Sequence, residues 1–467
     1  MNKNRLRLKY LIYDILSAFI VWVLFMLFRR TVNDAQLFES VRIFIPNYSF
    51  LSILFVYPFV CAFFHYISGF YLKPEQQTKT GYILTTFTSS ALISIVIFFV
   101  LLLDDILVSY QYYYYSLLVL FILMFSITLI FRSLIISDVN NRFKTKKWTI
   151  NTLIIGVGKN ASKIASELEK NSYKNTLCGF VSVDNTTFTV PKDSIIGNFS
   201  QIEHLITQNT IEEVIIALDD PDELKLFNYI NTLYKFNIDI KFTPRLHEIL
   251  TGSARIGSVG LNPLVSLTDI HMPDWQIATK RVFDIAFSTL MLILLLPVFL
   301  YFAIAIKFDS KGPVFYLQER IGRYGKAFNI LKFRTMHQNA ENGTPKLSSA
   351  TDERVTRIGK ILRKYRIDEL PQFWNILKGE MSVVGPRPER KYYINQIIED
   401  APYYCLLYKI RPGLTSWGPI KIGYSDTIEK MVERLNYDII YMEDMSLLND
   451  LQIMILTIEI LFKGKGV

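Results

Sequence analysis

Two adjacent carboxylates in the C-terminal part of the chain are the residues best suited to chemistry. Asp368 and Glu369 follow a segment in which apolar residues form one helical stripe and basic residues fill the other positions, and Pro371 comes next but one. Adjacent side chains on a helix point in different directions, so the two carboxylates need not do the same job. One could attack phosphorus while the other binds Mg²⁺ or handles a proton. An arbitrary Asp-Glu pair is more often a solvated pair that balances basic neighbours.

Basic residues near this pair favour an anionic ligand. Several of them lie in loops punctuated by Gly and Pro rather than on helix faces, namely Lys332, Arg334, Arg387 and Arg411. Arginine suits bidentate phosphate recognition, and lysine acts as a point charge. Prolines on both sides of Arg387 restrict its backbone and lower the entropy cost of holding it in place. Each residue alone would be a surface charge, but together they indicate an anion-binding site.

The composition indicates a membrane protein. The chain has 467 residues, of which 51% are hydrophobic and 14% aromatic, a high share for a soluble protein. The formal net charge of +9 fits nucleic acid, an anionic membrane surface or a pyrophosphate substrate. Nucleic acid is not predicted as a partner, because the sequence has no recognition-helix or RNP-like pattern. The scattered cysteines Cys61, Cys178 and Cys405 support neither a disulfide framework nor a zinc site.

Four apolar runs predict a four-helix transmembrane bundle over residues 1–140, since each approaches the roughly 20 residues that a spanning helix needs. The runs cover about residues 10–28, 50–71, 82–103 and 114–136. Basic residues precede the first run and follow the last, whereas Asp104 and Asp105 follow the third. The positive-inside rule therefore places both ends of the bundle in the cytoplasm. Asp14 and His65 lie within the runs, where a helix end or the bundle interior explains them as well as function does.

Residues 141–275 predict a soluble α/β domain with a Rossmann-like fold. The segment "WTINTLIIGVGKNASKIASELEKN" predicts a strand, a glycine turn and a helix, and "IEEVIIALDD" and "IDIKFTP" predict further strands. The loop Gly156–Ala161 could place a phosphate on the helix N-terminus, with Asp184 as the acidic residue that dinucleotide-binding folds carry further on. No Tyr-x-x-x-Lys sequence accompanies the loop, as a short-chain dehydrogenase or dehydratase would require. We therefore interpret the domain as regulatory or structural.

The last region, residues 276–467, begins with a fifth apolar run at about residues 282–306, and Pro297 interrupts it. Proline removes a backbone donor and bends a helix, and within lipid the freed carbonyl needs another partner. The run is therefore either a kinked spanning helix or a hairpin that enters and leaves on one face. If it crossed the membrane, the basic C-terminal region would lie outside, away from nucleotide donors.

Ordered motifs fill the rest of this region: "KRVFD", "GPVFYLQERIG", "FNILKFRTM", "DERVTRIGKILRKYRIDELPQFWNILKGEMSVVGPRPE", "RPGLTSWG" and "YMEDMSLLNDLQIMILTI". Together they make residues 280–467 resemble the bacterial sugar transferase family, the monotopic phosphoglycosyl transferases. The bundle and the α/β segment resemble in architecture the large members, the polyprenyl-phosphate hexose-1-phosphate transferases. The resemblance implies Mg²⁺ as cofactor, a UDP-sugar donor and undecaprenyl phosphate as acceptor.

The resemblance also implies roles for single residues. The family's acidic dyad corresponds to Asp368, the covalent nucleophile, and Glu369, a catalytic residue and metal ligand. Substrate-binding positions correspond to Lys332, Arg334, Arg366, Arg387, Arg411 and Asp450. The helix-breaking proline of the family's re-entrant run corresponds to Pro297. Leu296 departs from the small polar residue that often precedes this proline, and "TSWGPI" replaces a common Gly-Trp-Ala-Gln pattern, which leaves the donor-sugar contacts open.

The resulting prediction is an α-helical membrane bundle, an α/β Rossmann-like domain and a mixed, mainly α-helical, monotopic catalytic domain with a re-entrant membrane helix. By resemblance, it would form undecaprenyl-diphosphate-sugar through a phosphosugar on Asp368, release UMP and initiate surface polysaccharide synthesis. It would act in the bacterial inner membrane, in contact with the lipid bilayer and with its catalytic domain on the cytoplasmic face. We leave open whether it forms a homodimer. The alternatives are a membrane nucleotide-sugar dehydratase or epimerase and a non-enzymatic membrane scaffold or sensor.

Overall fold

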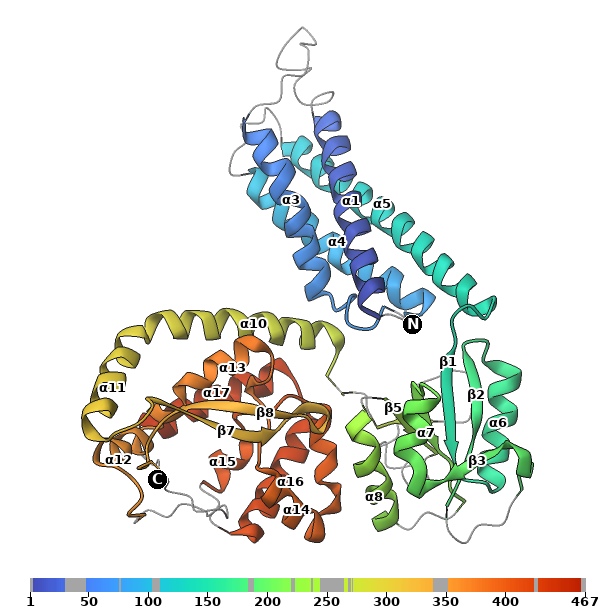
Figure 1. The fold of residues 1–467 in the computed structure, drawn as a ribbon. Helices are drawn as coiled ribbons and strands as arrows, with labels where there is room; N and C mark the ends of the chain where they lie inside the picture. Colours follow the sequence, from blue (N-terminus) through green and yellow to red (C-terminus); the bar gives the residue numbers. More distant parts are fainter. Residues whose placement is uncertain are drawn as a thin grey trace. The chain divides into compact units, whose positions relative to one another are not determined.

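The computed structural model forms two compact units. It describes residues 3–29, 48–74, 77–102, 110–183, 189–219, 223–236, 238–243, 264–267, 270, 272–338, 352–423 and 427–462. The first unit comprises Met1–Thr149 and Pro273–Thr279, and the second comprises Ile150–Met272 and Lys280–Val467. Figure 1 colours the chain from the blue N-terminal helices through the green sheet to the red C-terminal helices.

Apolar helices make up most of the first unit. They are α1 (Lys3–Arg29), α3 (Tyr48–Ile67), α4 (Lys79–Leu102) and α5 (Tyr110–Lys144). Among the described residues, segments of α1, α4 and α5 are long and apolar enough to cross a membrane, and α3 contributes the shorter apolar stretch Leu54–Ile67. Three of the four predicted membrane helices are therefore confirmed, and the chain is a membrane protein.

The four helices share one buried core and also carry an apolar outer surface. Trp22 of α1, Tyr57 of α3, Ile93 of α4 and Met124 of α5 meet in the core. Outward residues are apolar too; Leu84, for example, has 64% of its surface exposed. A helix that is apolar on all sides suits lipid rather than water.

A buried ion pair links α1 to α5 inside this bundle. Arg132 Nε and Nη2 donate to the two carboxylate oxygens of Asp14 at 3.0 and 2.7 Å, and neither side chain is exposed. Tyr71 Oη also donates to Asp14 at 2.6 Å, and Arg132 Nη1 donates to Thr86 at 2.9 Å. Such a pair is stable in lipid only when nearly every polar atom is satisfied. Asp14 is thus explained by a partner, Arg132, that lies 118 residues away and was not singled out from the sequence.

The turn after α3 packs closely on the first turn of α10 (Asp274–Leu294), whose residues up to Thr279 belong to the first unit. Gly69 has φ 81°, and a Cβ there would lie 2.6 Å from the carbonyl carbon of Asp274. A glycine meets both requirements, because it adopts positive φ readily and leaves room for the neighbouring backbone.

The second unit begins with a six-stranded sheet of order β3-β2-β1-β4-β5-β6. Its strands are β1 (Ile150–Ile155), β2 (Asn175–Ser182), β3 (Ile195–Asn198), β4 (Glu213–Ile216), β5 (Asp239–Phe242) and β6 (Val265–Ser266). The first five are parallel, and β6 is antiparallel to β5. The strands predicted from three sequence segments are confirmed as β1, β4 and β5.

Helices cover both faces of this sheet. They are α6 (Lys159–Asn171), α7 (Ile202–Gln208) and α8 (Glu223–Leu233). Along β1, Leu153 and Ile155 join the core under α7 and α8, whereas Ile154 joins the core under α6. This alternation follows from the period of two along a strand, and it explains why the strand reads as a continuous apolar run.

The core under α7 and α8 also receives side chains from η7 (Pro402–Lys409) of the C-terminal region. Cys405 is fully buried in it, and Tyr408 packs against it. Asn231 Nδ2 of α8 donates to the carbonyl of Pro402 at 3.0 Å. The sheet and the C-terminal region therefore share a packed boundary within the second unit.

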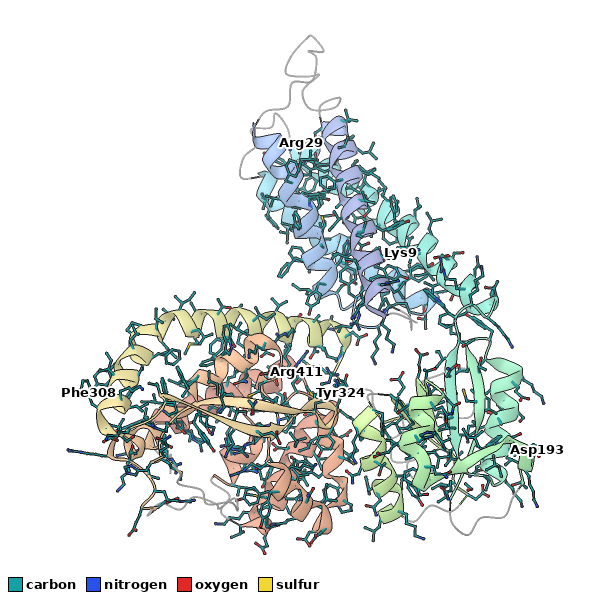
Figure 2. The ribbon with its side chains drawn as sticks, in the orientation of Figure 1. Lys9, Arg29, Asp193, Phe308, Tyr324 and Arg411 are labelled. Atoms are coloured by element: carbon teal, nitrogen blue, oxygen red, sulfur yellow. The ribbon has the colours of Figure 1, made fainter. Side chains whose placement is uncertain are left out.

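The fifth apolar run is broken where the sequence predicts. Helix α10 ends at Leu294, α11 spans Leu296–Asp309, and the two are bent by 59°. Pro297 lies in the first turn of α11, where its missing N–H has no intrahelical partner to lose. The outer faces are apolar, and Phe308 near the end of α11 is 88% exposed (Figure 2). A bent pair of this kind either crosses as a broken span or turns back as a re-entrant loop.

The remaining chain is mainly helical around small strand pairs (Figure 1). The strands are β7 (Phe315–Ile321), antiparallel to β8 (Ala327–Phe333), and β9 (Ser382–Val384), parallel to β10 (Gly413–Thr415). The helices are α12 (Arg357–Lys364), η6 (Ile367–Gln372), α13 (Phe373–Lys378), α14 (Lys391–Asp400), α15 (Trp417–Lys421), α16 (Ile428–Glu443) and α17 (Leu447–Phe462). These elements position the predicted site.

Candidate active site

The two carboxylates lie on η6, a short 3₁₀-helix. The preceding helix α12 is capped by Thr356, whose Oγ1 accepts from the Gly359 N–H at 3.0 Å. Arg366 then turns the chain in the left-handed backbone region, with φ 54°. A 3₁₀-helix has about three residues per turn, so Asp368 and Glu369 project roughly 120° apart. Different directions for the two groups were predicted, but a separate 3₁₀-helix rather than the end of α12 provides them.

Glu369 is a buried carboxylate surrounded by three cations. Its Oε1 accepts from Lys332 Nζ and Arg387 Nη2, each at 2.9 Å, and Arg366 Nη1 lies 3.5 Å from Oε2. Only 10% of the Glu369 side chain is exposed. Burial alone would favour the neutral acid, but the charges of Arg387, Lys332 and Arg366 outweigh it and hold the pKa of Glu369 well below its usual range. Glu369 is therefore ionised at neutral pH.

Asp368 is half-buried beside this cluster and has no such partners. Among the described residues, no group donates a hydrogen bond to its carboxylate, although charges of Lys332, Arg363 and Arg366 act on it from a distance. Burial and the negative charge of Glu369 raise the pKa of Asp368 to about 6. The result is a carboxylate that is largely ionised at pH 7, weakly solvated and available to attack an electrophile.

The cations around Glu369 come from segments far apart in the sequence. Lys332 lies on β8, Arg366 precedes η6, and Arg387 lies between two prolines after β9. The sequence analysis selected all three, and the structure brings them to one carboxylate. Burial lowers the pKa of Lys332, and the nearby Glu369 opposes this effect.

A second ion-pair group, absent from the sequence analysis, supports the Arg387 loop. Glu389 accepts from Arg320 at 3.3 Å through Oε2 and from Arg434 through Oε1. Arg320 also donates to the carbonyl of Pro388 at 3.2 Å, so it ties β7 to the loop that carries Arg387. Glu389 lies within the quoted "GPRPE" motif, but Arg434 looks like any surface charge on amphipathic α16. Only the tertiary fold reveals the pairing.

The other predicted substrate-binding residues make contacts elsewhere in the C-terminal region. Arg334 donates to the carbonyls of Lys311 and Ser310 at 2.8 and 2.7 Å, and so joins β8 to the end of α11. Arg411 Nε, labelled in Figure 2, donates to the carbonyl of Gly379 at 2.9 Å. These contacts do not bring either residue to the carboxylate pair, and their roles toward substrate stay predictions.

Asp450 lies in a separate buried contact. It accepts hydrogen bonds from Lys280 Nζ and Tyr441 Oη, and Lys280 also donates to the carbonyl of Val384 at 2.9 Å. This contact fastens the start of the apolar run to β9 and α17. Its geometry explains why an acidic residue is needed there, whereas the predicted contact with substrate remains untested.

Comparisons with known proteins match two different parts of the chain. A family model described as bacterial sugar transferase matches residues 275–464, and one described as CoA-binding domain matches residues 67–244. An uncharacterized sugar transferase of Haemophilus influenzae is 32% identical over 350 residues, which cover 68% of this chain and 70% of that protein. The membrane helices and the carboxylate pair thus belong to a transferase: the chain is a member of the bacterial sugar transferase family, and the resemblance is confirmed.

Relatives with more specific names match over shorter stretches. The UDP-N-acetylgalactosamine-undecaprenyl-phosphate N-acetylgalactosaminephosphotransferase of Aeromonas hydrophila is 37% identical over 49% of this chain. The UDP-glucose:undecaprenyl-phosphate glucose-1-phosphate transferase of Klebsiella pneumoniae is 35% identical over 60% of this chain. The chain spans 54% and 60% of these two relatives, respectively.

Proposed function

We propose that this protein transfers a sugar 1-phosphate from a UDP-sugar to undecaprenyl phosphate, with Asp368 as the nucleophile. The observation that carries the proposal is the contrast within the pair: three cations hold Glu369, while no group in the described part of the chain donates to the carboxylate of Asp368. The names of the relatives from Aeromonas hydrophila and Klebsiella pneumoniae support this substrate class. They name different sugars, so the sugar itself is not proposed.

In the first step, a carboxylate oxygen of Asp368 attacks the β-phosphorus of the UDP-sugar. The new bond joins this oxygen to phosphorus, the bond between the β-phosphorus and the bridging oxygen breaks, and UMP leaves with the bonding electrons. Lys332, Arg366 and Arg387 offset the negative charge on the phosphoryl oxygens and the leaving group. Glu369 keeps these cations in place, because it is itself ionised among them.

In the second step, a phosphate oxygen of undecaprenyl phosphate attacks the phosphorus of the aspartyl phosphosugar. The bond to Asp368 breaks, the carboxylate is restored, and undecaprenyl-diphosphate-sugar leaves. No net proton is taken up in either step, so the pair needs a nucleophile and a charge scaffold rather than an acid and a base. A covalent intermediate lets donor and acceptor use one site in turn.

Magnesium fits this pair as part of a substrate complex. In the described ranges no group of three or more His, Cys, Asp or Glu is placed to hold a metal, so a cage of protein ligands is not offered. Mg²⁺ commonly binds one or two carboxylates together with substrate phosphates. We propose Glu369 as its ligand through Oε2, because the 2.9 Å contacts of Lys332 and Arg387 are with Oε1, and Arg366 lies 3.5 Å from Oε2. Bound there, the ion would neutralise charge on the diphosphate.

We further propose that α10 and α11 form a re-entrant hairpin. Near its start, Arg281 donates to the carbonyls of Ile376 and Leu377 at 2.7 and 2.9 Å. At its end, Arg334 holds the carbonyls of Ser310 and Lys311. Both ends are thus fastened to one small folded region. A spanning segment would place its ends about 30 Å apart on opposite sides of the bilayer.

Re-entry places the sheet and the C-terminal region on the same side of the membrane, which we propose is the cytoplasmic side. Cysteines introduced at Asp193 and Asp400, both exposed, test this in a chain without its three native cysteines. An impermeant reagent added to intact cells should label neither position. Labelling at position 400 alone would show that the pair crosses the bilayer. We also propose that the α/β domain is Rossmann-like, as its strand order favours.

The transfer reaction is tested with the full chain in lipid nanodiscs and a panel of UDP-sugars. We expect UMP release with at least one UDP-sugar, and a diphosphate-linked lipid when undecaprenyl phosphate is added. A dehydratase or epimerase would change the sugar without releasing UMP, and a scaffold or sensor would do neither. Absence of UMP across the panel, with acceptor and Mg²⁺ present, would overturn the proposal.

A further inference from the structure

The match to a CoA-binding domain raises the question of whether the α/β domain can take CoA or a dinucleotide. In doubly wound sheets such ligands bind where the strand order reverses, with their phosphates on the first helix N-terminus. Here that place lies between β1 and β4, at the turn Gly156-Val157-Gly158 before α6. Asp184, predicted as the ribose-binding acid, lies outside the described residues.

A carboxylate of the chain itself occupies this helix N-terminus. Asp219, three residues after β4, accepts from the N–H of Lys159 through Oδ2 at 3.0 Å and from the N–H of Asn160 through Oδ1 at 2.8 Å. Both of its oxygens are engaged by the first two N–H groups of α6. They are two of the N–H groups that a phosphate at this helix start would use.

The same carboxylate fills the space above the glycine. A Cβ at Gly158 would lie 1.9 Å from Asp219 Oδ2, so the carboxylate lies where a pyrophosphate would otherwise approach the backbone. In addition, Asn160 Nδ2 donates to the carbonyl of Leu218 at 3.0 Å and holds the segment that carries Asp219.

The surrounding backbone also leaves little space between the ends of β1 and β4. A Cβ at Gly156 would lie 2.4 Å from the carbonyl oxygen of Ala217, so the ends of β1 and β4 are in close contact. On the other side, the N–H of Thr189 donates to the carbonyl of Val157 at 2.9 Å. The residues present therefore do not fit a diphosphate at this place.

We infer that Asp219 replaces the phosphate of a ligand, and that this turn does not bind CoA or a dinucleotide. The carboxylate supplies the negative charge and the two acceptors that a phosphate would bring, and it repels a second anion. The glycines are then required by close packing, at Ala217 and at Asp219, rather than by a ligand. The inference is independent of the proposed transfer reaction.

The test compares the full chain with Asp219→Ala and with Asp193→Ala, which removes an exposed acid of the same domain (Figure 2). Thermal unfolding and hydrogen exchange of residues 156–161 are measured with CoA, NADH or pyrophosphate. UDP is avoided because the proposed active site would bind it. In the wild type and in Asp193→Ala we expect no ligand-dependent protection of these residues.

In Asp219→Ala we expect a melting temperature lower by roughly 2–4 °C, because the variant loses a helix cap. Exchange at residues 159 and 160 should become faster, and pyrophosphate should partly restore protection there. Saturable CoA or NADH binding to the wild type that protects residues 156–161 would overturn the inference. Unchanged exchange in Asp219→Ala would also overturn it, because Asp219 would then not cap the helix.

Discussion

Two places in the second unit bring a carboxylate to clustered donors, with opposite results. At the turn before α6, Asp219 accepts from the first two N–H groups of the helix and occupies the place of an anion. On η6, Lys332 and Arg387 are held by Glu369, while the carboxylate of the adjacent Asp368 has no hydrogen-bond donor among the residues that the structure describes. The first arrangement caps a helix, and the second leaves the carboxylate that we propose as the nucleophile beside positive charge.

Clustered charge therefore does not identify a functional site by itself. A functional site is better indicated by the charged groups that have no partner within the protein after its internal ion pairs and hydrogen bonds are assigned. At η6 the carboxylate of Asp368 remains, and its pKa is raised because burial and the charge of Glu369 disfavour its ionised form. At the α6 turn no donor of the first two residues remains.

The largest expected effect comes from Asp368→Asn, which keeps the shape and removes the attacking oxygen. We expect kcat to fall by roughly 10⁴-fold or more, with the protein still folded. Incubation with a UDP-sugar labelled in the sugar, without acceptor lipid, should label the wild-type protein and release UMP, and the variant should do neither. Mass spectrometry should locate the phosphosugar in the peptide containing "YRIDELPQ".

Asp400→Asn, at an exposed acid on α14, is the matched control and should react like the wild type. If Asp368→Asn still forms the labelled adduct, the nucleophile assignment is wrong. Direct attack of the lipid phosphate on the UDP-sugar would then be the better mechanism.

Glu369→Gln should be the next most severe change. It leaves the nucleophile in place but removes the charge that holds Lys332 and Arg387, and such misplacement costs roughly 10²-fold in kcat. The variant should still form the adduct slowly, which separates it from Asp368→Asn. Single-turnover UMP release measures this difference. A rate equal to that of the wild type would show that the cations do not depend on Glu369.

The pH dependence of UMP release should distinguish Asp368 from Glu369. Because burial and Glu369 raise the pKa of Asp368 to about 6, UMP release without acceptor should fall about tenfold per pH unit below 6. Glu369→Gln removes one of these causes, so its inflection should move to lower pH. Omitting undecaprenyl phosphate keeps the titration of the acceptor out of the profile. An inflection that stays in place in Glu369→Gln would contradict the assignment to Asp368.

Stability should respond with the opposite sign. The folded chain binds the Asp368 proton more tightly than the unfolded chain, in which the pKa of this aspartate is near its ordinary value of 3.8. Stability from this group is present at low pH and is lost as the pH rises from about 4 to about 6. Asp368→Asn should therefore raise the melting temperature at pH 7 while it abolishes transfer.

The smallest expected effect concerns removal of the bundle and the sheet. A fragment beginning near Pro273 keeps every residue of the carboxylate site, so its UMP release should stay within about tenfold, or 1.4 kcal/mol, of the full chain. Its melting temperature should fall, because Cys405 and Tyr408 lose the core against which they pack. Asn231→Ala in the full chain removes one hydrogen bond across this boundary and should have a smaller effect. A folded, membrane-bound fragment without activity would refute the prediction.

The sequence predicted features that depend on local pattern. The apolar helices, the strands β1, β4 and β5, and the break at Pro297 follow from periodicity and from proline chemistry. Lys332 and Arg387 were selected as basic residues in punctuated loops, and Arg366 was selected by the family resemblance. The loop prediction was wrong for Lys332, which lies on strand β8. The division into three domains stays a prediction.

Pairings across long sequence distances were beyond the reach of local pattern. Arg132 lies in an apolar run that hid its charge, and Asp219 lies 59 residues from the Asn160 N–H that it accepts. Glu389 and Arg434 are 45 residues apart. The 3₁₀-helix at η6 was also missed, because the positive φ of Arg366 is set by packing and not by an intrinsic preference of arginine.

That backbone conformation has a consequence for how position 366 can vary. Left-handed geometry costs a non-glycine residue about 1 kcal/mol, and glycine or asparagine adopts it more readily. A library selected only for heat resistance should therefore accumulate Arg366→Gly or Arg366→Asn. Selection for transfer should restore arginine, because the guanidinium 3.5 Å from Glu369 is lost in both variants. We therefore expect the two selections to act in opposite directions at this position, because the backbone prefers glycine and the proposed reaction uses a cation.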